Sequence, residues 1–327
     1  MMNWKQLAKI VVACAALAGS ATQGFSQQWP TRPVKVVVPY GAGGVTDTMA
    51  RLTADRLTKT LGQSFVIENK VGAGGAIGVD YAMSLPRDGY TILFVGSTLF
   101  TVLPLAQKVN YEPLKDLVPV SITGTNGMVM VVPKDSPFTT LKQFVDYARA
   151  NPGKITYSTG GPATNNHLAT AYFAGKEKLD MVHVPFKGGQ PALTAVMSKS
   201  VDMLFSNSSD LIEPAKAGTV RALAVSTPKR MPQLPDVPAV AEIYPGYDYI
   251  AWNGYAVPGG VPEEVKKRLA EVLLPITRDP QIVETFYKLG IDALGTTPEE
   301  ALAIIRKDIP IYSQIVDIAG VRLNSAR

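Results

Sequence analysis

The most constraining feature of this sequence is an apolar, β-branched run, Val34–Val38, that leads through a glycine-rich stretch into a helical pattern. Such a run is typical of a strand buried on both faces of a parallel sheet. Gly41-Ala-Gly-Gly44 follows it, and apolar residues then recur at helical spacing over residues 46–61. Glycines let a backbone approach a bound group, and free N–H groups at a helix start favour an anion. A carboxylate or phosphate would suit this loop, although the same glycines can also serve only as a tight turn.

The strand, turn and helix pattern recurs along the chain, which predicts parallel βαβ units. Each predicted strand is followed by glycines or small polar residues and then by a helix. The pattern of strand, turn and helix occurs in both halves of the sequence. We therefore predict an α/β fold of two lobes, each a mostly parallel sheet flanked by helices, connected by two crossovers. The predicted strands are residues 34–38, 64–68, 91–95, 118–123 and 128–133 in the first half, then 155–158, 181–185, 201–205, 221–227 and 251–258 in the second.

The two crossovers would divide the chain into a discontinuous domain and an inserted one. We expect residues 27–124 and 250–327 to form lobe 1, and residues 125–249 to form lobe 2. Ligands in open α/β sheets bind beyond the carboxyl ends of the strands. Two facing lobes would therefore surround one cleft, which a two-crossover hinge would allow to open and close.

Residues 1–26 have the order of a secretory signal peptide. Lys5 and Lys9 precede an apolar stretch at residues 10–18, and small and polar residues follow. That stretch is too short to span a bilayer. We expect cleavage before Gln27 and export of the chain. The only cysteine, Cys14, lies in this leader, which argues against disulfides and thiol catalysis in the mature chain.

The net charge argues against a nucleic-acid-binding protein, and the glycine motifs argue against a dinucleotide-binding enzyme. The formal net charge is +5, and the leader lysines account for two, so the remainder is +3 (5 minus 2), too small to indicate nucleic-acid binding. The dinucleotide fingerprint Gly-x-Gly-x-x-Gly fails from Gly41, because Thr46 stands at its last position. It fails from Gly72 as well, because Ile77 stands there.

A hydrolase would need a nucleophile with a base beside it. His167 and His183 are the only histidines; we interpret the first as bracing a helix start and the second as a packed strand residue. No Gly-x-Ser-x-Gly elbow, His-Glu-x-x-His motif or cysteine pair occurs. We therefore predict no enzyme activity, no cofactor and no metal.

Four residues at predicted strand-to-helix turns are candidates for ligand contact or for fixing the turns. Asp47 and Asp210 can cap helices or shape a pocket, and capping is favoured for Asp47. Tyr40 ends a central strand and carries a hydroxyl that needs a partner, so it can contact a ligand or pack between lobes. Lys187 is the only cation in the proposed cleft loops. Backbone N–H groups, hydroxyls, Asn side chains and water would then supply most hydrogen bonds to an anion.

Several motifs in order resemble those of the Bug-type receptors, the periplasmic solute-binding proteins of tripartite tricarboxylate transporters. The resemblance spans nearly the whole mature chain. The motifs are Trp29-Pro-Thr-Arg-Pro-Val-Lys-Val-Val-Val-Pro39-Tyr-Gly-Ala-Gly-Gly44 with Asp47 and Arg51, Val66-Ile-Glu-Asn-Lys-Val-Gly-Ala-Gly-Gly75, Pro86-Arg-Asp-Gly-Tyr-Thr-Ile-Leu93, Tyr157-Ser-Thr-Gly160 with Asn166-His-Leu-Ala169, Val182-His-Val-Pro-Phe-Lys-Gly188, Arg221-Ala-Leu-Ala-Val225 and Trp252-Asn-Gly-Tyr255.

The resemblance implies a two-lobed periplasmic binding protein fold, type II-like, that closes on a small carboxylate and delivers it to an integral-membrane permease. In relatives the loops that match residues 40–47 and 158–167 grip one carboxylate from opposite lobes. The ligand-binding residues implied are Tyr40, Gly43, Gly44, Thr46, Asp47, Ser158, Thr159, Gly160, Thr164 and Asn165. We expect the substrate to be chosen at the far end of the cleft, by Ser97, Thr98, Asn207, Ser208 and Asp210.

The loops depart from the family pattern, which leaves the ligand open. Tyr40-Gly-Ala stands where Phe-x-Pro is common, and Thr159-Gly-Gly-Pro replaces a more serine-rich loop. The ligand can be citrate-like, an aliphatic dicarboxylate, an aromatic acid or an amino acid. The partner expected is a permease, with a signalling protein as the alternative. We expect a periplasmic monomer that binds no nucleic acid. The alternative from a different functional class is a secreted enzyme that processes a carboxylate.

Overall fold

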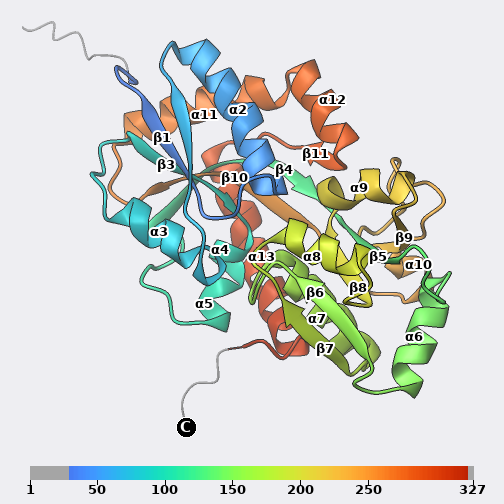
Figure 1. Cartoon of the computed structure of the whole chain (residues 1–327). Coiled ribbons are helices and arrows are strands. Elements are labelled where there is room, and N and C mark those ends of the chain that lie inside the picture. The colour runs from blue at the N-terminus through green and yellow to red at the C-terminus, as the bar shows by residue number, and fades with distance from the viewer. Residues whose placement is uncertain (1–28, 323–327) are drawn as a thin grey trace, which may run out of the picture. The chain divides into compact units, whose positions relative to one another are not determined.

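The computed structural model describes residues 29–322, and the described residues from Arg32 onward belong to one compact unit. The predicted signal peptide therefore lies outside the described residues. Within this unit the strands form two sheets, one with six strands and one with five, and helices cover both (Figure 1). The fold prediction of two α/β sheets flanked by helices is confirmed.

The first sheet has the strand order β11-β4-β10-β3-β1-β2. β1 pairs in parallel with β2 and with β3, whereas β10 runs antiparallel to its neighbours β3 and β4. The apolar, β-branched run of the sequence is β1, and most of its side chains are buried. The strands are β1 Val34–Val38, β2 Phe65–Asn69, β3 Thr91–Gly96, β4 Leu117–Asn126, β10 Ala251–Pro258 and β11 Ile291–Ala293.

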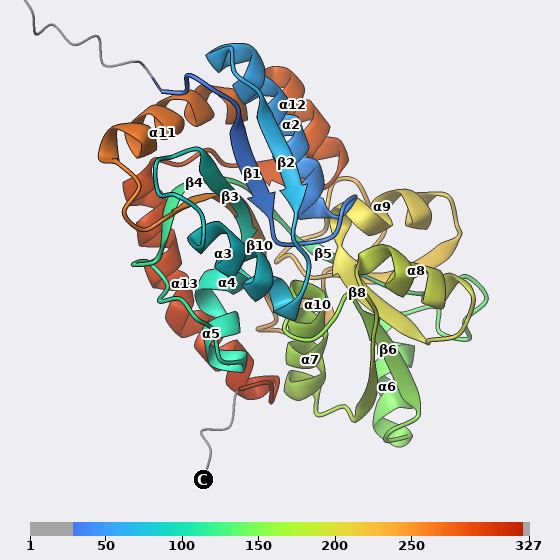
Figure 2. The same cartoon turned by 60° about the vertical axis from the view of Figure 1, so that its left-hand side comes forward.

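Helices from both ends of the chain surround this sheet, as the blue, teal and orange ribbons of Figure 2 show. The helix predicted at residues 46–61 is α2, which begins one residue earlier, at Val45. The helices here are α2 Val45–Leu61, η1 Ala73–Gly75, α3 Ala76–Met83, α4 Thr98–Thr101, α5 Leu103–Ala106, α11 Glu263–Thr277, α12 Pro280–Lys288 and α13 Pro298–Ile318.

The second sheet has the order β7-β6-β8-β5-β9. β6 is parallel to β7 and β8, and β5 is antiparallel to β8 and β9. Its strands are β5 Met128–Pro133, β6 Ile155–Thr159, β7 Met181–Pro185, β8 Met203–Asn207 and β9 Val220–Val225; its helices are α6 Leu141–Ala150, α7 Asn165–Glu177, α8 Gly189–Met197, α9 Ser208–Lys216 and α10 Val240–Ile243.

The sheets were predicted to be mostly parallel, but both are mixed and parallel pairings do not dominate in either. The crossovers explain why. β4 ends in the first sheet at Asn126, and β5 begins in the second at Met128. The chain returns to the first sheet as β10. β5 and β10 are thus the strands that enter a sheet from the other one, and each runs against its neighbours.

The first half of the molecule is here the first sheet with the helices given with it, and the second half is the second sheet with its helices. Helix α13 contributes to the cores of both halves. Ala301 and Ile305 belong to the core of the first sheet, with Leu93, whereas Tyr312 and Val316 belong to that of the second. In both views α13, drawn in red, runs from the first sheet to α7 (Figures 1 and 2). The proposed division at residues 124/125 and 249/250, with 250–327 in lobe 1, stays a prediction, because α13 serves both halves.

Candidate functional site

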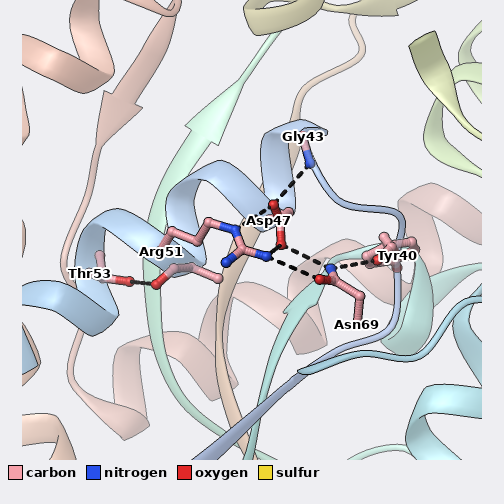
Figure 3. Close-up of polar contacts among 7 residues, drawn as sticks. Tyr40, Gly43, Asp47, Arg51, Thr53 and Asn69 are labelled. Atoms are coloured by element: carbon pink, nitrogen blue, oxygen red, sulfur yellow. Dashed lines mark hydrogen bonds and ion pairs between the residues drawn. The ribbon is translucent and has the colours of Figure 1, made fainter. Parts of the chain in front are cut away.

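Asp47 fixes the glycine loop that follows β1. It is the third residue of α2, and its carboxylate accepts hydrogen bonds from Gly43 N at 2.9 Å and Asn69 Nδ2 at 2.9 Å. Arg51, one turn along the helix, donates from Nε at 2.8 Å and from Nη2 at 3.0 Å (Figure 3). Both carboxylate oxygens are therefore engaged within the protein, and the loop backbone is held in place.

The environment of Asp47 keeps it ionised. Its side chain is only 3% exposed, and this burial raises the pKa of the carboxyl. Hydrogen bonds from Arg51, Gly43 and Asn69 outweigh burial and hold the pKa of Asp47 below its usual value. The helix N-cap is Gly44, so Asp47 is a first-turn carboxylate that reaches back to the loop, not the N-cap itself.

Tyr40 lies at the end of the same strand and points toward β3. Its Oη is 3.2 Å from Thr98 Oγ1, and its carbonyl accepts from Asn69 Nδ2 at 2.9 Å. Asn69 therefore connects the start of the loop to Asp47 (Figure 3). Burial of the hydroxyl raises the pKa of Tyr40 to about 12, so the group remains a neutral donor and acceptor at physiological pH.

Polar groups from both halves meet around Gly96 at the end of β3. A Cβ placed on Gly96 would lie 3.4 Å from Tyr40 Oη, 3.5 Å from Asn253 Oδ1 and 3.7 Å from Asn165 Nδ2. Tyr40 and Asn253 belong to the first half, whereas Asn165 begins α7 in the second and accepts from Tyr249 Oη at 2.9 Å. The structure thus brings Tyr40 and Asn165 together, and their contact with a ligand stays a prediction.

A chain of buried side-chain hydrogen bonds extends from the first loop to the second half. Thr46 Oγ1 donates to Asn253 Oδ1 at 2.7 Å, and Asn253 Nδ2 donates to Asn126 Oδ1 at 3.1 Å. Asn126 Nδ2 then donates to Asn207 Oδ1 at 3.0 Å. Sequence reasoning assigned no role to Asn126 or Asn253, because their partners are far away in the chain.

The side chains of the second loop are occupied within the protein. Ser158 Oγ is fully buried and donates to the carbonyl of Ala192 at 3.1 Å. Thr159 Oγ1 lies 2.6 Å from His183 Nε2 and accepts from Gly161 N at 3.2 Å. A Cβ on Gly160 would lie 3.2 Å from the carbonyl carbon of Gly188, so this backbone is packed closely.

Thr164 and His167 complete the second loop. Thr164 Oγ1 donates to the Gly161 carbonyl at 2.6 Å, and His167 Nδ1 accepts from Ala163 N at 3.2 Å. The His167 ring stacks on that of His183, with centroids 4.2 Å apart. Burial, with the neighbouring His183, lowers the pKa of His167 to about 4. His167 is thus a neutral brace for the loop, as predicted.

The second loop also contacts the first half. Ala163 has a φ of 57°, which an L-residue rarely adopts, and it is buried within the core of the first sheet. A Cβ on Gly74 would lie 3.8 Å from Ala163 Cβ and 3.6 Å from the Pro162 carbonyl. The loops of the two halves are therefore in contact beside the polar cluster at Gly96.

The remaining predicted residues lie at the ends of β3 and β8. The Ser97 hydroxyl is buried with no hydrogen-bond partner among the described residues. Ser208 Oγ donates to the carbonyl of Gly290 at 2.9 Å and so connects the halves. Asp210 is the third residue of α9 and accepts from Ser206 Oγ at 3.2 Å. Burial raises the pKa of Asp210.

Residues 29–322 contain neither a cluster of metal-ligating side chains nor a helix that could span a membrane. No group of three or more His, Cys, Asp or Glu side chains is arranged to hold a metal ion there. In the same range, none of the helices combines the length and the apolar character needed to cross a bilayer.

A family model described as the tripartite tricarboxylate transporter family receptor, TctC, matches residues 49–320. The chain belongs to this family. A UPF0065 protein encoded between tcbD and tcbE in Pseudomonas sp. strain P51 is 34% identical over 96% of this chain and 95% of its own length. BugT of Bordetella pertussis is 30% identical over 98% of this chain and 100% of its own. The resemblance to Bug-type receptors is confirmed.

Three solved structures are similar to this chain, and two of them contain a named ligand. A periplasmic transporter is 31% identical, with a TM-score of 0.85 over 90% of this chain and 100% of its own. A protein of R. palustris solved with adipate is 30% identical, with a TM-score of 0.86 over 90% and 99%. MatC from Rhodopseudomonas palustris, with bound malate, is 28% identical, with a TM-score of 0.83 over 88% and 100%. This TctC-family chain is therefore a solute-binding receptor, not an enzyme.

Proposed function

We propose that this TctC-family receptor binds a small carboxylate between its two halves and delivers it to the permease subunits of a tripartite tricarboxylate-type transporter. The observation that carries the proposal is the meeting of Tyr40, Asn253 and Asn165, from both halves, around Gly96. The relatives that contain adipate and malate support a carboxylate as the ligand.

The proposed binding groups are neutral donors rather than a cationic clamp. The N-termini of α2 and α7 follow the two loops and present free N–H groups, which favour an anion. The hydroxyl of Tyr40 and the amide of Asn165 lie beside them. Ser158, Thr159 and Asp47 act on the ligand through the backbone they hold, because their side chains are already hydrogen-bonded.

Capture in this account depends on closure about the two crossovers, near residues 124–128 and 249–251. A ligand shifts an equilibrium between open and closed states only if it binds one of them better. A ligand could contact Tyr40 of one half and Asn165 of the other at the same time only in the closed state. It would therefore bind the closed state better than the open one.

The family supports a location and a partner for this receptor. We propose export by the leader at residues 1–26, a periplasmic location, and a permease as the membrane partner. The receptor acts as a monomer in this proposal, and neither nucleic acid nor a cofactor takes part.

Calorimetry of the purified chain with a panel of carboxylates tests the proposal. We expect at least one carboxylate to bind, and Tyr40→Phe to weaken that binding by about tenfold or more, because a hydrogen bond to a charged group contributes about 1.5–3 kcal/mol. The matched control is Tyr255→Phe, which removes a hydroxyl that lies 2.9 Å from Thr53 Oγ1 in the core of the first half.

The two tyrosine variants should differ in what they lose. Tyr255→Phe should lower the free energy of unfolding by about 1 kcal/mol and leave affinity unchanged. A Tyr40→Phe variant with wild-type affinity would remove Tyr40 from the site, and a folded chain that binds no carboxylate of the panel would refute the proposed function.

A further inference from the structure

Each half of the molecule places an aspartate at the third residue of a helix that follows a sheet strand. Asp47 occupies this position in α2, and Asp210 occupies it in α9. Arg51, four residues after Asp47, neutralises the first carboxylate through two hydrogen bonds. Pro214 stands four residues after Asp210, so α9 has no arginine at the position from which Arg51 neutralises Asp47 in α2.

The surroundings of Asp210 contain weak donors but no cation. Ser206 Oγ is 3.2 Å from Oδ2, and Ser209 Oγ is 3.3 Å from Oδ1. Across from α9, a Cβ on Gly189 at the start of α8 would lie 3.2 Å from Oδ2. Within residues 29–322 no salt bridge reaches Asp210, although the residue is only partly exposed.

Asp210 lies one residue away from the second ligand loop. The nitrogen of Gly189 is 3.3 Å from the position that a Cβ on Gly160 would take. One residue, Gly189, thus separates the Asp210 carboxylate from the loop proposed to hold the ligand. Glycine at position 189 leaves the carboxylate without a side chain between it and that loop.

We propose that Asp210 sets the substrate class by favouring a carboxylate whose far end bears an amino or hydroxyl group over one that bears a second ionised carboxylate. This inference rests on the proposed function, since it needs one carboxylate of the ligand to occupy the shared site. An uncompensated carboxylate accepts a hydrogen bond from a donor and repels a second anion, most strongly where water is scarce. Burial also raises the pKa of Asp210, as expected for an anion that no cation neutralises.

The test uses length-matched ligands that differ only at the far end. Calorimetry is run with butanoate, 4-hydroxybutanoate, 4-aminobutanoate and succinate, and with the corresponding six-carbon series that ends in adipate. The wild-type chain should bind the hydroxy or amino acid of at least one series tenfold or more tighter than the diacid of that series. Asp210→Asn should reduce this preference by tenfold or more, mainly by strengthening diacid binding.

Two further variants separate the effect of charge from a loss of structure. Asp180→Asn removes an exposed carboxylate from the same half and should leave every affinity unchanged. Asp210→Ser removes the charge with a smaller side chain and should shift the preference in the same direction as Asp210→Asn. Unchanged affinity for the unsubstituted monoacid shows that the shared site is intact in each variant.

The pH profile provides a readout that a purely structural role would not change. The groups that face Asp210 are the hydroxyls of Ser206 and Ser209, the amide of Asn207 and the backbone of Gly189. Lys187, before α8, is exposed. As the pH falls toward the pKa of Asp210, repulsion of the diacid should fade. The ratio of wild-type to Asp210→Asn affinity for the diacid should therefore rise toward one, and titration of the ligand itself cancels in that ratio.

The outcomes separate this inference from the proposed function. Binding of carboxylates with the same preference in wild type and in both Asp210 variants would overturn the role of Asp210 and leave the receptor function in place. A wild-type preference for the diacid would overturn it too. If no carboxylate of a wide panel binds the folded chain, the proposed function fails and the inference fails with it.

Discussion

At the scale of single residues, Asp47 determines the geometry of the first loop. It joins Gly43 of the loop, Asn69 at the end of β2 and Arg51 of α2 through one buried carboxylate (Figure 3). The ion pair with Arg51 thus differs from an ordinary surface pair, because one partner is almost fully buried. The exposed pair of Asp55 and Lys59 on the same helix has the same i,i+4 spacing.

We expect Asp47→Asn to lower the free energy of unfolding by about 1–3 kcal/mol at pH 7, because Arg51 and the loop N–H lose a charged acceptor. The pKa of Asp47 is lower in the folded than in the unfolded chain. Its contribution is therefore fully present above the unfolded value, about 3.9, and is lost as the pH falls through the folded value. Urea unfolding at several pH values should show the wild type and the variant converging below about pH 4.

Asp55→Asn is the matched control for this prediction, and it should cost about 0.5 kcal/mol or less. Equal losses for the two variants, or a difference between wild type and Asp47→Asn that grows in acid, would contradict the role given to Asp47.

The local sequence indicated which loops lie close together better than it indicated what their side chains contact. Tyr40 and Asn165 do meet around Gly96, whereas their role in ligand binding stays a prediction. Ser158 and Thr159 were expected as contacts, but adjacent strand residues face opposite sides of a sheet. The Ser158 side chain accordingly packs toward α8, and Thr159 reaches His183. Asn253 could not be assigned, since its partners Thr46 and Asn126 come from distant parts of the chain.

At the scale of elements, the packing of α7 against α13 holds the end of the chain onto the second half. Gly175 in α7 lies against the last turn of α13, where a Cβ would sit 2.2 Å from the carbonyl oxygen of Ile318. No side chain can occupy that position unless the helices move apart. A glycine inside a helix is normally unfavourable, so close packing explains why this one is tolerated.

We expect Gly175→Ala to lower the free energy of unfolding by about 1–3 kcal/mol through overpacking. The direction of the change in the free energy of unfolding is informative, because a glycine-to-alanine change in an exposed helix would stabilise that helix by about 1 kcal/mol. Thermal and urea unfolding measure the effect. Gly41→Ala, where no atom lies within 4 Å of the added Cβ, should change stability little; a stabilised Gly175→Ala would show that the two helices do not pack as described.

Long periodic elements were predictable, and short or context-dependent ones were not. The β-branched run of β1 and the helical spacing of α2 carry their own signals. β11, at Ile291–Ala293, has too few residues to show a period, and it exists because β4 offers it a pairing edge. The antiparallel direction of β10 follows from the route of the chain between sheets, which no local pattern encodes.

At the scale of the whole molecule, the proposed ligand-binding loops are coupled to the connections between the halves. The hydrogen bonds from Thr46 through Asn253 and Asn126 reach Asn207, and Asn126 ends the strand from which the chain crosses to the second half. Ala163 of the second loop packs in the first core beside Gly74. A ligand that orders both loops would therefore act directly on the contacts between the halves.

The most direct test of the central claim is an experimental structure of the protein with the tightest-binding carboxylate from the calorimetric panel. The account predicts that the oxygens of one carboxylate lie within about 3 Å of donors from both halves, in the segments 40–47 and 158–165. A carboxylate that contacts only one half would contradict it. A ligand bound elsewhere would also contradict it, for example one in the groove lined by Phe186 and by Pro191 and Ala195 of α8.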